Sequence, residues 1–454
     1  MSDPLAWLIE ECHGLLEKAV EKAYPAARLP PSKYAIPPNP EMGELSTPSS
    51  FQLARSLGNR PSEIAESIVG QIDPSVSELI ERVESVSGYI NFRTNISRFS
   101  ELVIETAIQE DSEYGFLKVE EPKKVMVEHT SANPNGPIHI GNARNSILGA
   151  CLAEMLKRRG HEVAVHFLVN DMGRQVAMAT FGWILLGMPE PKGRAELWVG
   201  TIYASVNVVT QLQSLREQLK EAEDRGRVME IAELQAEIEE YEEAKKQLRE
   251  RYPRVYDTLE KEIPEIENLE SEIVKLNTAY ENNEPKTVES VRRLIGYCLE
   301  GFKTSLGEIG INFDSFDYES DLVWRKSADL VLKKLKETPY VYQDQGATIL
   351  DCDRIAEDYD LKKRWDLNPD HDIPRLVLVR SDGTTLYTLR DMAYSIWKFG
   401  FVDRVINVIG YEQTLAQLQL RLALAALGET WMADNQLHYA YEFVKLPGVK
   451  MSGR

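Results

Sequence analysis

One segment, residues 125–171, constrains the fold more than any other part of the chain. It opens with Val125-Met126-Val127, a short apolar run of the kind that a buried parallel strand shows. A turn rich in Pro and Asn follows, then a helical pattern over residues 145–160 that stops at Gly160, then a second apolar run over residues 161–171. This order predicts a βαβ unit, with ligands expected at the carboxyl ends of its strands.

The predicted helix of this unit should pack one apolar face on the sheet. Six side chains share that face: Ile147, Leu148, Cys151, Leu152, Met155 and Leu156. Cys151 is one of four cysteines, and the others, Cys12, Cys298 and Cys352, form no C-x-x-C pair with it or with one another. We therefore expect neither a disulfide framework nor a thiolate metal site, and interpret all four as small buried hydrophobic side chains.

The residues before this unit predict a small α+β domain. Helical apolar spacing covers residues 4–20, and residues 51–72 have the pattern of two helices broken before Pro61. Residues 80–94 have the pattern of two strands around a Ser-Gly turn. A charged, Pro-containing linker then leads into the βαβ unit.

The middle of the chain predicts a long helical hairpin. Residues 206–251 are dense in Glu, Lys, Arg, Gln and Leu, with apolar side chains at three- and four-residue steps on both sides of Gly226. We expect two antiparallel helices joined near residues 222–227, as a solvated hairpin inserted into the larger domain. A surface for a specific partner is the alternative interpretation.

The last third of the chain alternates strands and helices. Residues 282–316 predict an amphipathic helix, and residues 340–351 and 374–400 predict hairpins, the second with a Ser-Asp-Gly turn and a following helix. Residues 403–413 have the pattern of a final buried strand, and residues 414–428 that of its helix. The sequence stops on the basic segment KLPGVKMSGR, and we expect a further portion beyond it.

Charge and hydropathy exclude some classes of protein. The 72 acidic and 52 basic side chains give a net charge of -20, which argues against a surface built throughout for nucleic-acid phosphates. A local basic groove stays compatible with this balance. The first residues lack the pattern of a signal peptide, and no apolar run approaches the roughly 20 residues that span a membrane. We therefore expect a cytoplasmic protein.

Two short motifs lie far apart in the predicted larger domain. His139-Ile140-Gly141 joins the first strand to its helix, and Lys450-Met451-Ser452 follows the last predicted helix. In this order they resemble the HIGH and KMSKS signatures of class I aminoacyl-tRNA synthetases. The fourth position of the first motif is Asn142 instead of His, and that of the second is Gly453 instead of Lys. The resemblance implies an α/β fold: a Rossmann-like, HIGH-type nucleotide-binding catalytic domain with helical insertions, preceded by the small α+β N-terminal domain.

A site of this class must stabilise the negative charge that grows on the α-phosphate of ATP and on the departing pyrophosphate. A helix N-terminus, an imidazole and mobile cations are suitable donors. The resemblance implies His139, Gly141 and Lys450 as the ATP-binding residues, with Gly141 letting the adenine approach the backbone. Arg454 would close on the phosphates beside Lys450. The full implied catalytic set is His139, Gly141, Asn142, Lys450, Met451, Ser452 and Arg454.

Several longer segments narrow the resemblance to arginyl-tRNA synthetases of the archaeal type. They are VEHTSANPNGPIHIGNARN at 127–145, VNDMGRQ at 169–175, TLYTLRD at 385–391 and GELSTPSSFQLARSLGNRPSEIAESI at 43–68. An arginine pocket needs carboxylates in a fixed fork around a planar guanidinium. The resemblance implies the carboxylates of Glu128 and Asp391 with the hydroxyl of Tyr387 for the guanidinium, Ser131 and Asn133 for the other end of the substrate, and Gln413 as a further contact. Asn170, Asp171 and Gln175 are expected near the site without an assigned role.

The implied function is that of an arginine–tRNA ligase. Arginine and ATP would form arginyl-adenylate, and the terminal ribose hydroxyl of tRNA-Arg would then take the arginyl group. The implied cofactors are ATP as substrate and Mg²⁺ with it, and no metal site of the protein itself is expected. The implied enzyme is a monomer without membrane association. The alternatives are a non-catalytic RNA-binding relative and a nucleotidyltransferase of the same superfamily that acts on a small molecule.

The resemblance also implies a division of the chain. The expected segments are 1–115, an additional domain that contacts tRNA; 120–185, the first half of the catalytic domain; 186–290, a helical insertion; 291–315, catalytic domain; 316–384, a second insertion; and 385–454, the second catalytic half, which ends at the KMSKS-like loop. The family's helical anticodon-binding domain would follow residue 454, so we expect the chain alone to recognise tRNA poorly.

Overall fold

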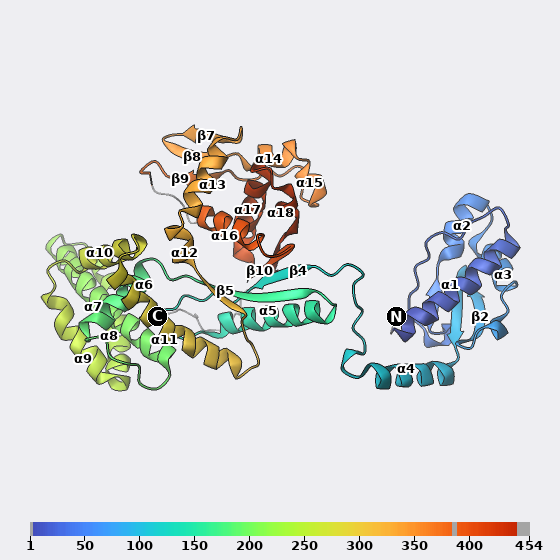
Figure 1. Ribbon diagram of the computed structural model, residues 1–454, viewed down its shortest axis with the longest axis horizontal. Coiled ribbons are helices and arrows are strands. Elements are labelled where there is room, and N and C mark those ends of the chain that lie inside the picture. Colours follow the sequence, from blue (N-terminus) through green and yellow to red (C-terminus); the bar gives the residue numbers. More distant parts are fainter. Residues whose placement is uncertain (1–2, 384–387, 443–454) are drawn as a thin grey trace. The chain divides into compact units, whose positions relative to one another are not determined.

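The computed structural model describes residues 3–383 and 388–442. They belong to two units, Met1–Val119 and Glu120–Arg454. The first unit packs helices against an antiparallel three-stranded sheet of order β1-β3-β2 (Figure 1). Ser87 and Gly88, with φ of 50° and 89°, form the tight turn between β2 and β3, so the predicted Ser-Gly hairpin is confirmed. The elements of this unit are α1 (Pro4–Ala23), β1 (Leu45–Thr47), α2 (Ser49–Leu57), α3 (Pro61–Val69), β2 (Ile80–Val86), β3 (Tyr89–Thr94) and α4 (Ile96–Glu110).

A parallel five-stranded sheet forms the centre of the second unit. Its strands lie in the order β11-β10-β4-β5-β6. If the five strands of this sheet are numbered by their order in the sequence, they lie as 3-2-1-4-5 when counted from the β6 edge. This is the strand order of the Rossmann fold. The predicted fold class is confirmed. The strands are β4 (Lys124–Glu128), β5 (Glu162–Val169), β6 (Ser315–Tyr318), β10 (Arg404–Gly410) and β11 (Gln436–Tyr441).

The prediction that residues 403–413 hold the final strand is wrong. Strand β11 follows β10 and pairs with it in parallel from Val405–Gln436 to Gly410–Tyr441. Its sequence, QLHYAY, mixes polar and apolar residues because it is an edge strand with a single neighbour in the sheet. It therefore lacks the continuous apolar run that identifies the buried strands β4 and β10.

Helices cover both faces of this sheet. Helix α5 (Ile140–Arg158) packs on one face through Ala153, against Val125, Val127 and Val165. Met126 and Val405 point to the other face, into a core shared with α16 (Thr388–Lys398) and α17 (Thr414–Ala426). Figure 1 shows α5 below the strands and these two helices above them. Helix α18 (Thr430–Asn435) precedes β11.

The contact face of α5 agrees with the prediction in part, because Leu148, Leu152 and Leu156 pack against the core of the sheet. Ile147 and Met155 are 49% and 56% exposed, and Cys151 is exposed as well. The stripe that is buried instead runs through Asn145, Gly149 and Ala153 at four-residue steps. Small and polar residues allow the helix to approach the sheet closely, so a count of apolar residues finds only one half of the contact face. The prediction of a buried cysteine holds for Cys12, Cys298 and Cys352 and is wrong for Cys151.

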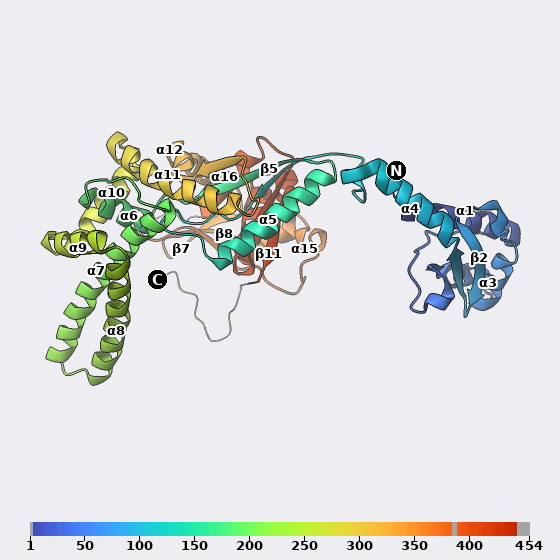
Figure 2. The same cartoon turned by 90° about the horizontal axis from the view of Figure 1, so that it is seen from below.

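Six helices, α6 to α11, follow β5 in the sequence and precede β6. Figure 2 shows α7 and α8 as a projecting antiparallel pair, which confirms the predicted hairpin and its turn at Gly226. The pair is less solvated than expected, because Val206, Val209 and Leu212 are at most 5% exposed in the core of this helical group. The helices are α6 (Arg174–Leu185), α7 (Ala195–Asp224), α8 (Val228–Arg251), α9 (Pro253–Glu262), α10 (Leu269–Glu281) and α11 (Pro285–Gly307). Helix α11 runs without a break through the boundary expected at residue 290.

A second, smaller group of helices and strands follows β6 in the sequence and precedes α16. It holds an antiparallel sheet of order β7-β8-β9, and β7 and β8 form the hairpin predicted for residues 340–351. Strand β9 pairs with β8, whereas the predicted partner of β9 beyond the Ser-Asp-Gly turn falls on residues 384–387, outside the described residues. The elements are α12 (Glu319–Trp324), α13 (Ser327–Lys336), β7 (Val341–Asp344), β8 (Ala347–Leu350), α14 (Cys352–Asp358), α15 (Leu361–Arg364) and β9 (Leu376–Val379).

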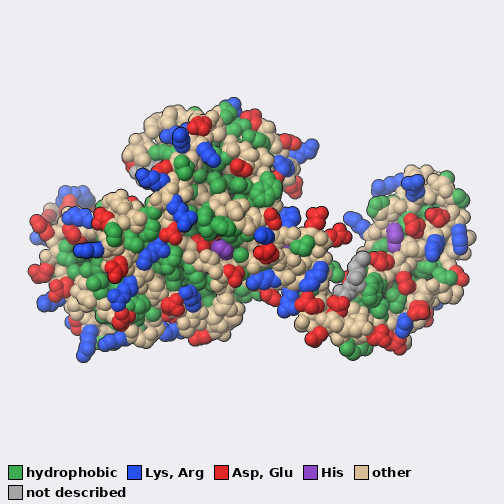
Figure 3. Space-filling view, in the orientation of Figure 1, with side chains coloured by type: hydrophobic (Ala, Val, Ile, Leu, Met, Phe, Trp, Pro, Cys, Tyr) green, Lys and Arg blue, Asp and Glu red, His purple; other side chains and the backbone are tan. Residues whose placement is uncertain are grey.

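Charge is spread over the visible surface. In the space-filling view of Figure 3, acidic and basic side chains are interspersed on both units. Within the described ranges, no helix combines the length and the apolar character needed to cross a membrane.

Candidate active site

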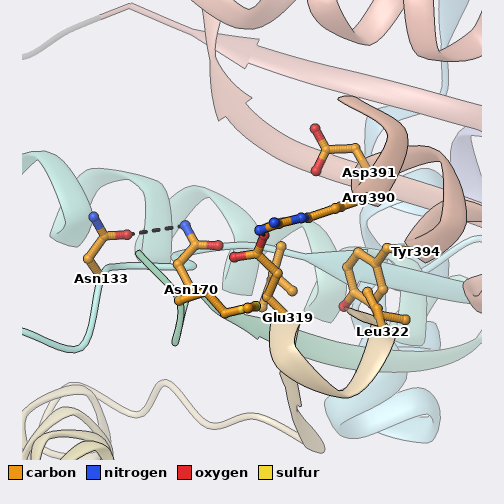
Figure 4. Close-up of a pocket in the computed structure, with 9 residues that line it drawn as sticks. Asn133, Asn170, Glu319, Leu322, Arg390, Asp391 and Tyr394 are labelled. Atoms are coloured by element: carbon orange, nitrogen blue, oxygen red, sulfur yellow. Dashed lines mark hydrogen bonds and ion pairs between the residues drawn. The ribbon is translucent and has the colours of Figure 1, made fainter. Parts of the chain in front are cut away.

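A cavity of about 320 Å³ opens at the carboxyl ends of β4, β5 and β6 (Figure 4). Its walls come from four parts of the chain: the turn after β4, the end of β5, the start of α12 and the first turns of α16. This is the edge at which a Rossmann-ordered sheet binds its ligands. The lining residues are Asn133, Leu168, Asn170, Met172, Glu319, Leu322, Arg390, Asp391 and Tyr394.

Two carboxylates, those of Glu319 and Asp391, face this cavity, and they differ in whether a described residue pairs with them. Glu319 is paired with Arg390, whose Nη1 lies 2.8 Å from Glu319 Oε1, and Figure 4 shows the guanidinium reaching across the cavity to it. Asp391 opens onto the cavity in the first turn of α16, and no ion pair with a described residue is seen for it. Asp391 is exposed to solvent on the cavity side, while desolvation by the protein around its carboxyl, together with the charges of Glu128 and Glu319, raises the pKa of that carboxyl to about 7. Asp391 is thus the acid available to a bound cation.

Glu128 lies beneath the cavity and is absent from its walls. It is 5% exposed, and its Oε2 is 2.7 Å from Nζ of Lys398, which is 1% exposed. Asn407 Oδ1 accepts a second hydrogen bond from Lys398 at 2.9 Å, and the ring of Tyr394 lies 4.3 Å from the same Nζ. The charge of Glu128 is therefore already balanced inside the protein. Direct contact of Glu128 with a guanidinium stays a prediction.

A second buried network supports the wall formed by Tyr394. The Tyr394 hydroxyl donates to Asp317 Oδ2 at 2.6 Å, and His166 Nδ1 lies 2.6 Å from the same oxygen. Ser315 donates to the other oxygen of Asp317 at 2.6 Å. Burial opposes ionisation of Asp317, but these hydrogen bonds hold the pKa of its carboxyl below the usual value. The tyrosine ring is thus fixed from β5 and β6.

Polar side chains form the wall opposite α16. Asn133 Oδ1 accepts from Asn170 Nδ2 at 3.1 Å, and Gln175 Oε1 accepts from Asn133 at 3.3 Å. Ser131 lies between the strands, where its Oγ accepts from the backbone N–H of Leu168 at 3.1 Å and donates to Glu128 at 3.3 Å. These contacts bring Ser131 and Asn133 to the same edge of the sheet, as the sequence predicts.

Helix α5 begins at Ile140, directly after His139. His139 Nδ1 accepts from the N–H of Gly141 at 3.1 Å, and Asn142 Oδ1 accepts from the N–H of His139 at 3.1 Å. The two side chains cap the helix reciprocally, which satisfies N–H groups that have no partner inside the helix. A Cβ at Gly141 would lie 3.0 Å from His139 Cε1, so the glycine lets the imidazole fold back on the helix start. Asn142 therefore has a capping role at the position where HIGH has its second histidine.

Other predicted residues lie elsewhere. Asp171 is fully buried and lines no part of the cavity, because Tyr280, Ser320 and Arg292 bind its carboxylate among the inserted helices. Gln413 is exposed in the turn after β10 and is not a lining residue of this cavity. Five predicted residues fall outside the described residues: Tyr387, Lys450, Met451, Ser452 and Arg454.

Among the residues of the site that were not predicted, four carry a charge or a hydroxyl: Arg390, Tyr394, Lys398 and Glu319. Arg390 stands beside Asp391 in the TLYTLRD segment, and that adjacency was a usable signal. Tyr394 and Lys398 lie one and two helical turns further on, so the spacing from Asp391 could have placed them on one side of α16. Glu319 comes from an insertion and follows β6 directly. No local pattern distinguishes it from the many surface acids of this chain.

Gly149 provides a test of how closely α5 packs behind the site. A Cβ at this position would lie 2.2 Å from Cγ of His129, whose ring is 1% exposed and whose pKa is lowered to about 4 by burial. Gly149→Ala is expected to lower the free energy of unfolding by about 1–3 kcal/mol in a urea titration, because the ring must move in a packed core. Gly296→Ala on α11, with no atom within 4 Å of its Cβ, should instead stabilise by up to about 1 kcal/mol. Equal effects of the two variants would contradict this packing.

The sheet order, a first helix that opens on His-Ile-Gly and a cavity at the adjoining strand ends together define a catalytic domain of the class I aminoacyl-tRNA synthetase type. The family described as "tRNA synthetases class I (R), catalytic domain" matches residues 103–185 and 223–445, and "Arginyl tRNA synthetase N terminal domain" matches residues 10–94. The chain belongs to the arginyl-tRNA synthetase family.

Curated relatives agree with this assignment, and a solved structure shares the fold. The arginine–tRNA ligase of Sulfurisphaera tokodaii is 40% identical over 429 residues, with 93% of this chain and 65% of that protein covered. The arginine–tRNA ligase of Saccharolobus solfataricus is 42% identical over 430 residues, with 92% and 65% covered. The chain thus spans 65% of the length of these relatives. The Thermus thermophilus arginyl-tRNA synthetase has the same fold, with a TM-score of 0.62, 23% identity, and 98% of this chain and 67% of that one covered.

Proposed function

We propose that this chain activates arginine with ATP and transfers the arginyl group to tRNA-Arg. The observation that carries the proposal is the cavity at the carboxyl ends of β4, β5 and β6, where Asp391 has no counterion among the described residues. Glu128 and Glu319 already have Lys398 and Arg390 as counterions. A guanidinium entering the cavity would therefore find one open carboxylate, which is the charge that a single cation needs.

The two ends of arginine would be bound by different walls. Asp391 would bind the guanidinium, with Tyr387 as a further hydroxyl partner. Asn133 and Ser131, on the turn after β4, would bind the α-amino and carboxylate end. Glu128 would act from beneath, by holding Ser131 through its 3.3 Å hydrogen bond. The distance between the acidic wall and the amide wall would then select a long side chain that ends in a cation.

ATP would bind beside the N-terminus of α5. The free N–H groups of a helix start and the imidazole of His139 are suitable donors to phosphate oxygens. We propose Lys450 and Arg454 as the cations of the phosphate site, with Met451 and Ser452 in the same motif. Magnesium would enter with ATP, whose phosphate oxygens it prefers. A monomeric state and a cytoplasmic location belong to the same proposal.

The reaction would need positioning more than covalent chemistry. The arginine carboxylate attacks the α-phosphate and pyrophosphate leaves; the ribose hydroxyl of tRNA then attacks the carbonyl of arginyl-adenylate and AMP leaves. Holding the two reactants in line supplies most of the acceleration. Charge stabilisation at the helix start adds to it.

The test is ATP–pyrophosphate exchange with each of the twenty amino acids, with and without total tRNA. We expect exchange with arginine and with none of the other nineteen amino acids. Because we expect this chain to recognise tRNA poorly, stimulation of the exchange should need a high tRNA concentration. Calorimetric titration of the same protein with arginine and with lysine provides a second readout, in which arginine binds and lysine does not, because an ammonium cannot form the paired hydrogen bonds of a guanidinium. Exchange with a different amino acid would refute the proposed substrate. Arginine binding without exchange under any condition would favour a non-catalytic relative.

A further inference from the structure

Asn145, on α5, has its side-chain amide fully bonded in the core. The residue is 6% exposed, and its Oδ1 accepts from the backbone N–H of Thr130 at 2.7 Å. Its Nδ2 donates to the carbonyl oxygen of Val408 and to the hydroxyl of Tyr441, each at 2.9 Å. One amide thus joins α5 to the turn after β4, to β10 and to β11.

The backbone that Asn145 holds is strained. Thr130 has φ of 69° and Ser131 has φ of 41°, so two consecutive residues other than glycine adopt the left-handed region. For a β-branched residue such as threonine this conformation is rare and persists only where its surroundings enforce it. The side chain of Thr130 is also held, since its Oγ1 lies 2.7 Å from Ser146 Oγ and 2.9 Å from His129 Nδ1.

This turn sets the direction in which the chain enters the cavity. Directly after it, Ser131 Oγ binds the N–H of Leu168 and the carboxylate of Glu128, and Asn133 reaches the cavity wall. A relaxation of Thr130 to negative φ would rotate the peptide that carries Ser131. Both side chains proposed to bind the α-amino and carboxylate end of arginine would then move together.

We propose that Asn145 is a positioning residue for the amino-acid substrate, which keeps Thr130 and Ser131 in the left-handed turn that fixes Ser131 beside Leu168 and Glu128 and presents Asn133 to the cavity. The inference rests on the proposed function, because it names arginine as the ligand. Asn145 itself does not line the cavity. Its effect would pass through the Thr130 hydrogen bond, while the bonds to Val408 and Tyr441 fix the amide on the sheet.

The test compares arginine binding by single and double variants of Asn145 and Thr130. It distinguishes an effect of Asn145 on the strained turn from an effect on the stability of the whole fold. Asn145→Ala is expected to weaken arginine binding about 10- to 100-fold in calorimetric titrations, as expected for a displaced binding group. Glycine adopts positive φ freely. Thr130→Gly should therefore bind arginine within about threefold of the unaltered protein, and adding Asn145→Ala to it should cost less than about fivefold.

Two further variants provide controls. Asn435→Ala removes hydrogen bonds to Trp431 and Arg404 at the opposite end of β11, and arginine affinity should stay unchanged. Tyr441→Phe removes one of the three partners of Asn145 and leaves the Thr130 bond in place, so its effect should be smaller than that of Asn145→Ala. An equal loss of affinity from Asn145→Ala in the unaltered protein and in the Thr130→Gly variant would overturn the inference.

Hydrogen–deuterium exchange of residues 129–133 provides a readout that needs no ligand. We expect faster exchange of this segment in Asn145→Ala, with the strands of the sheet still protected. If residues 129–133 are as well protected in Asn145→Ala as in the unaltered protein, the inference about Asn145 is overturned, and the proposed function is not affected. Absence of arginine binding by the unaltered protein would instead refute the proposed function, whatever the exchange rates are.

Discussion

Lys398→Met is expected to lower the free energy of unfolding by about 3–5 kcal/mol, because it leaves the carboxylate of Glu128 buried without a counterion. Lys398 and Glu128 are 1% and 5% exposed, and their charged atoms lie 2.7 Å apart. Methionine keeps most of the volume of the lysine stem, so the loss comes from charge and not from a cavity. Urea titration followed by circular dichroism measures the change.

The matched controls are a double variant and a surface lysine. Adding Glu128→Gln to Lys398→Met removes the stranded charge and should recover most of the lost stability. Lys334→Met, at an exposed position of α13, should change stability by less than about 0.5 kcal/mol. If the double variant is no more stable than Lys398→Met alone, the loss does not arise from an uncompensated carboxylate.

Asp391→Asn should weaken arginine binding by about 2–5 kcal/mol at pH 8, since the guanidinium would lose its carboxylate partner in a cavity whose other acid, Glu319, is already paired. Calorimetric titration with arginine measures this loss directly. The fold should not suffer. Because the pKa of Asp391 is raised to about 7 in the folded protein, its ionised form opposes folding, and this cost grows as pH rises from about 4 to 7. A neutral amide removes the cost.

The same pKa gives the pH dependence of binding. A bound guanidinium favours the ionised carboxylate, so binding releases a proton wherever free Asp391 is protonated. Affinity for arginine should rise up to about tenfold per pH unit below pH 7 and level off above about pH 8. Glu128, Glu319, Lys398 and Arg390 are the charged groups that shift this pKa. Asp391→Asn should show no such rise, and a rise that persists in the variant would assign the titration to another group.

The sequence predicts the parts of this fold that local patterns specify. Strand β4 and the turn at Ser87 and Gly88 each follow from a few adjacent residues, and the helix expected over residues 145–160 begins five residues earlier, at Ile140. Strand β11 was missed because an edge strand needs no continuous apolar run. The contact face of α5 was assigned only in part: Leu148, Leu152 and Leu156 pack on the sheet as predicted, whereas Asn145 and Gly149 are buried for reasons that lie on other elements, the turn after β4 and the ring of His129.

In the candidate site, even more depends on contacts between residues far apart in the sequence, which local patterns do not reveal. Glu128 and Asp391 could be named from the motifs around them, but the partner of Glu128 is 270 residues away in the sequence. That pairing gives the carboxylate of Glu128 a buried counterion, and nothing near either residue in the sequence indicates it. Glu319 enters the site from an insertion, where only the folded sheet brings it opposite Arg390.

The four separate origins of the cavity walls have a consequence for folding. Asn133, Leu168, Glu319 and Asp391 come together only when β4, β5, β6 and α16 are all in place. Contacts between such distant segments form slowly, because long loops must close first. Partly folded forms of the chain would have no complete cavity, so any ligand of the cavity would bind the native state alone and stabilise it by mass action. A ligand of the cavity would thereby bind only completely folded molecules and protect them from unfolding.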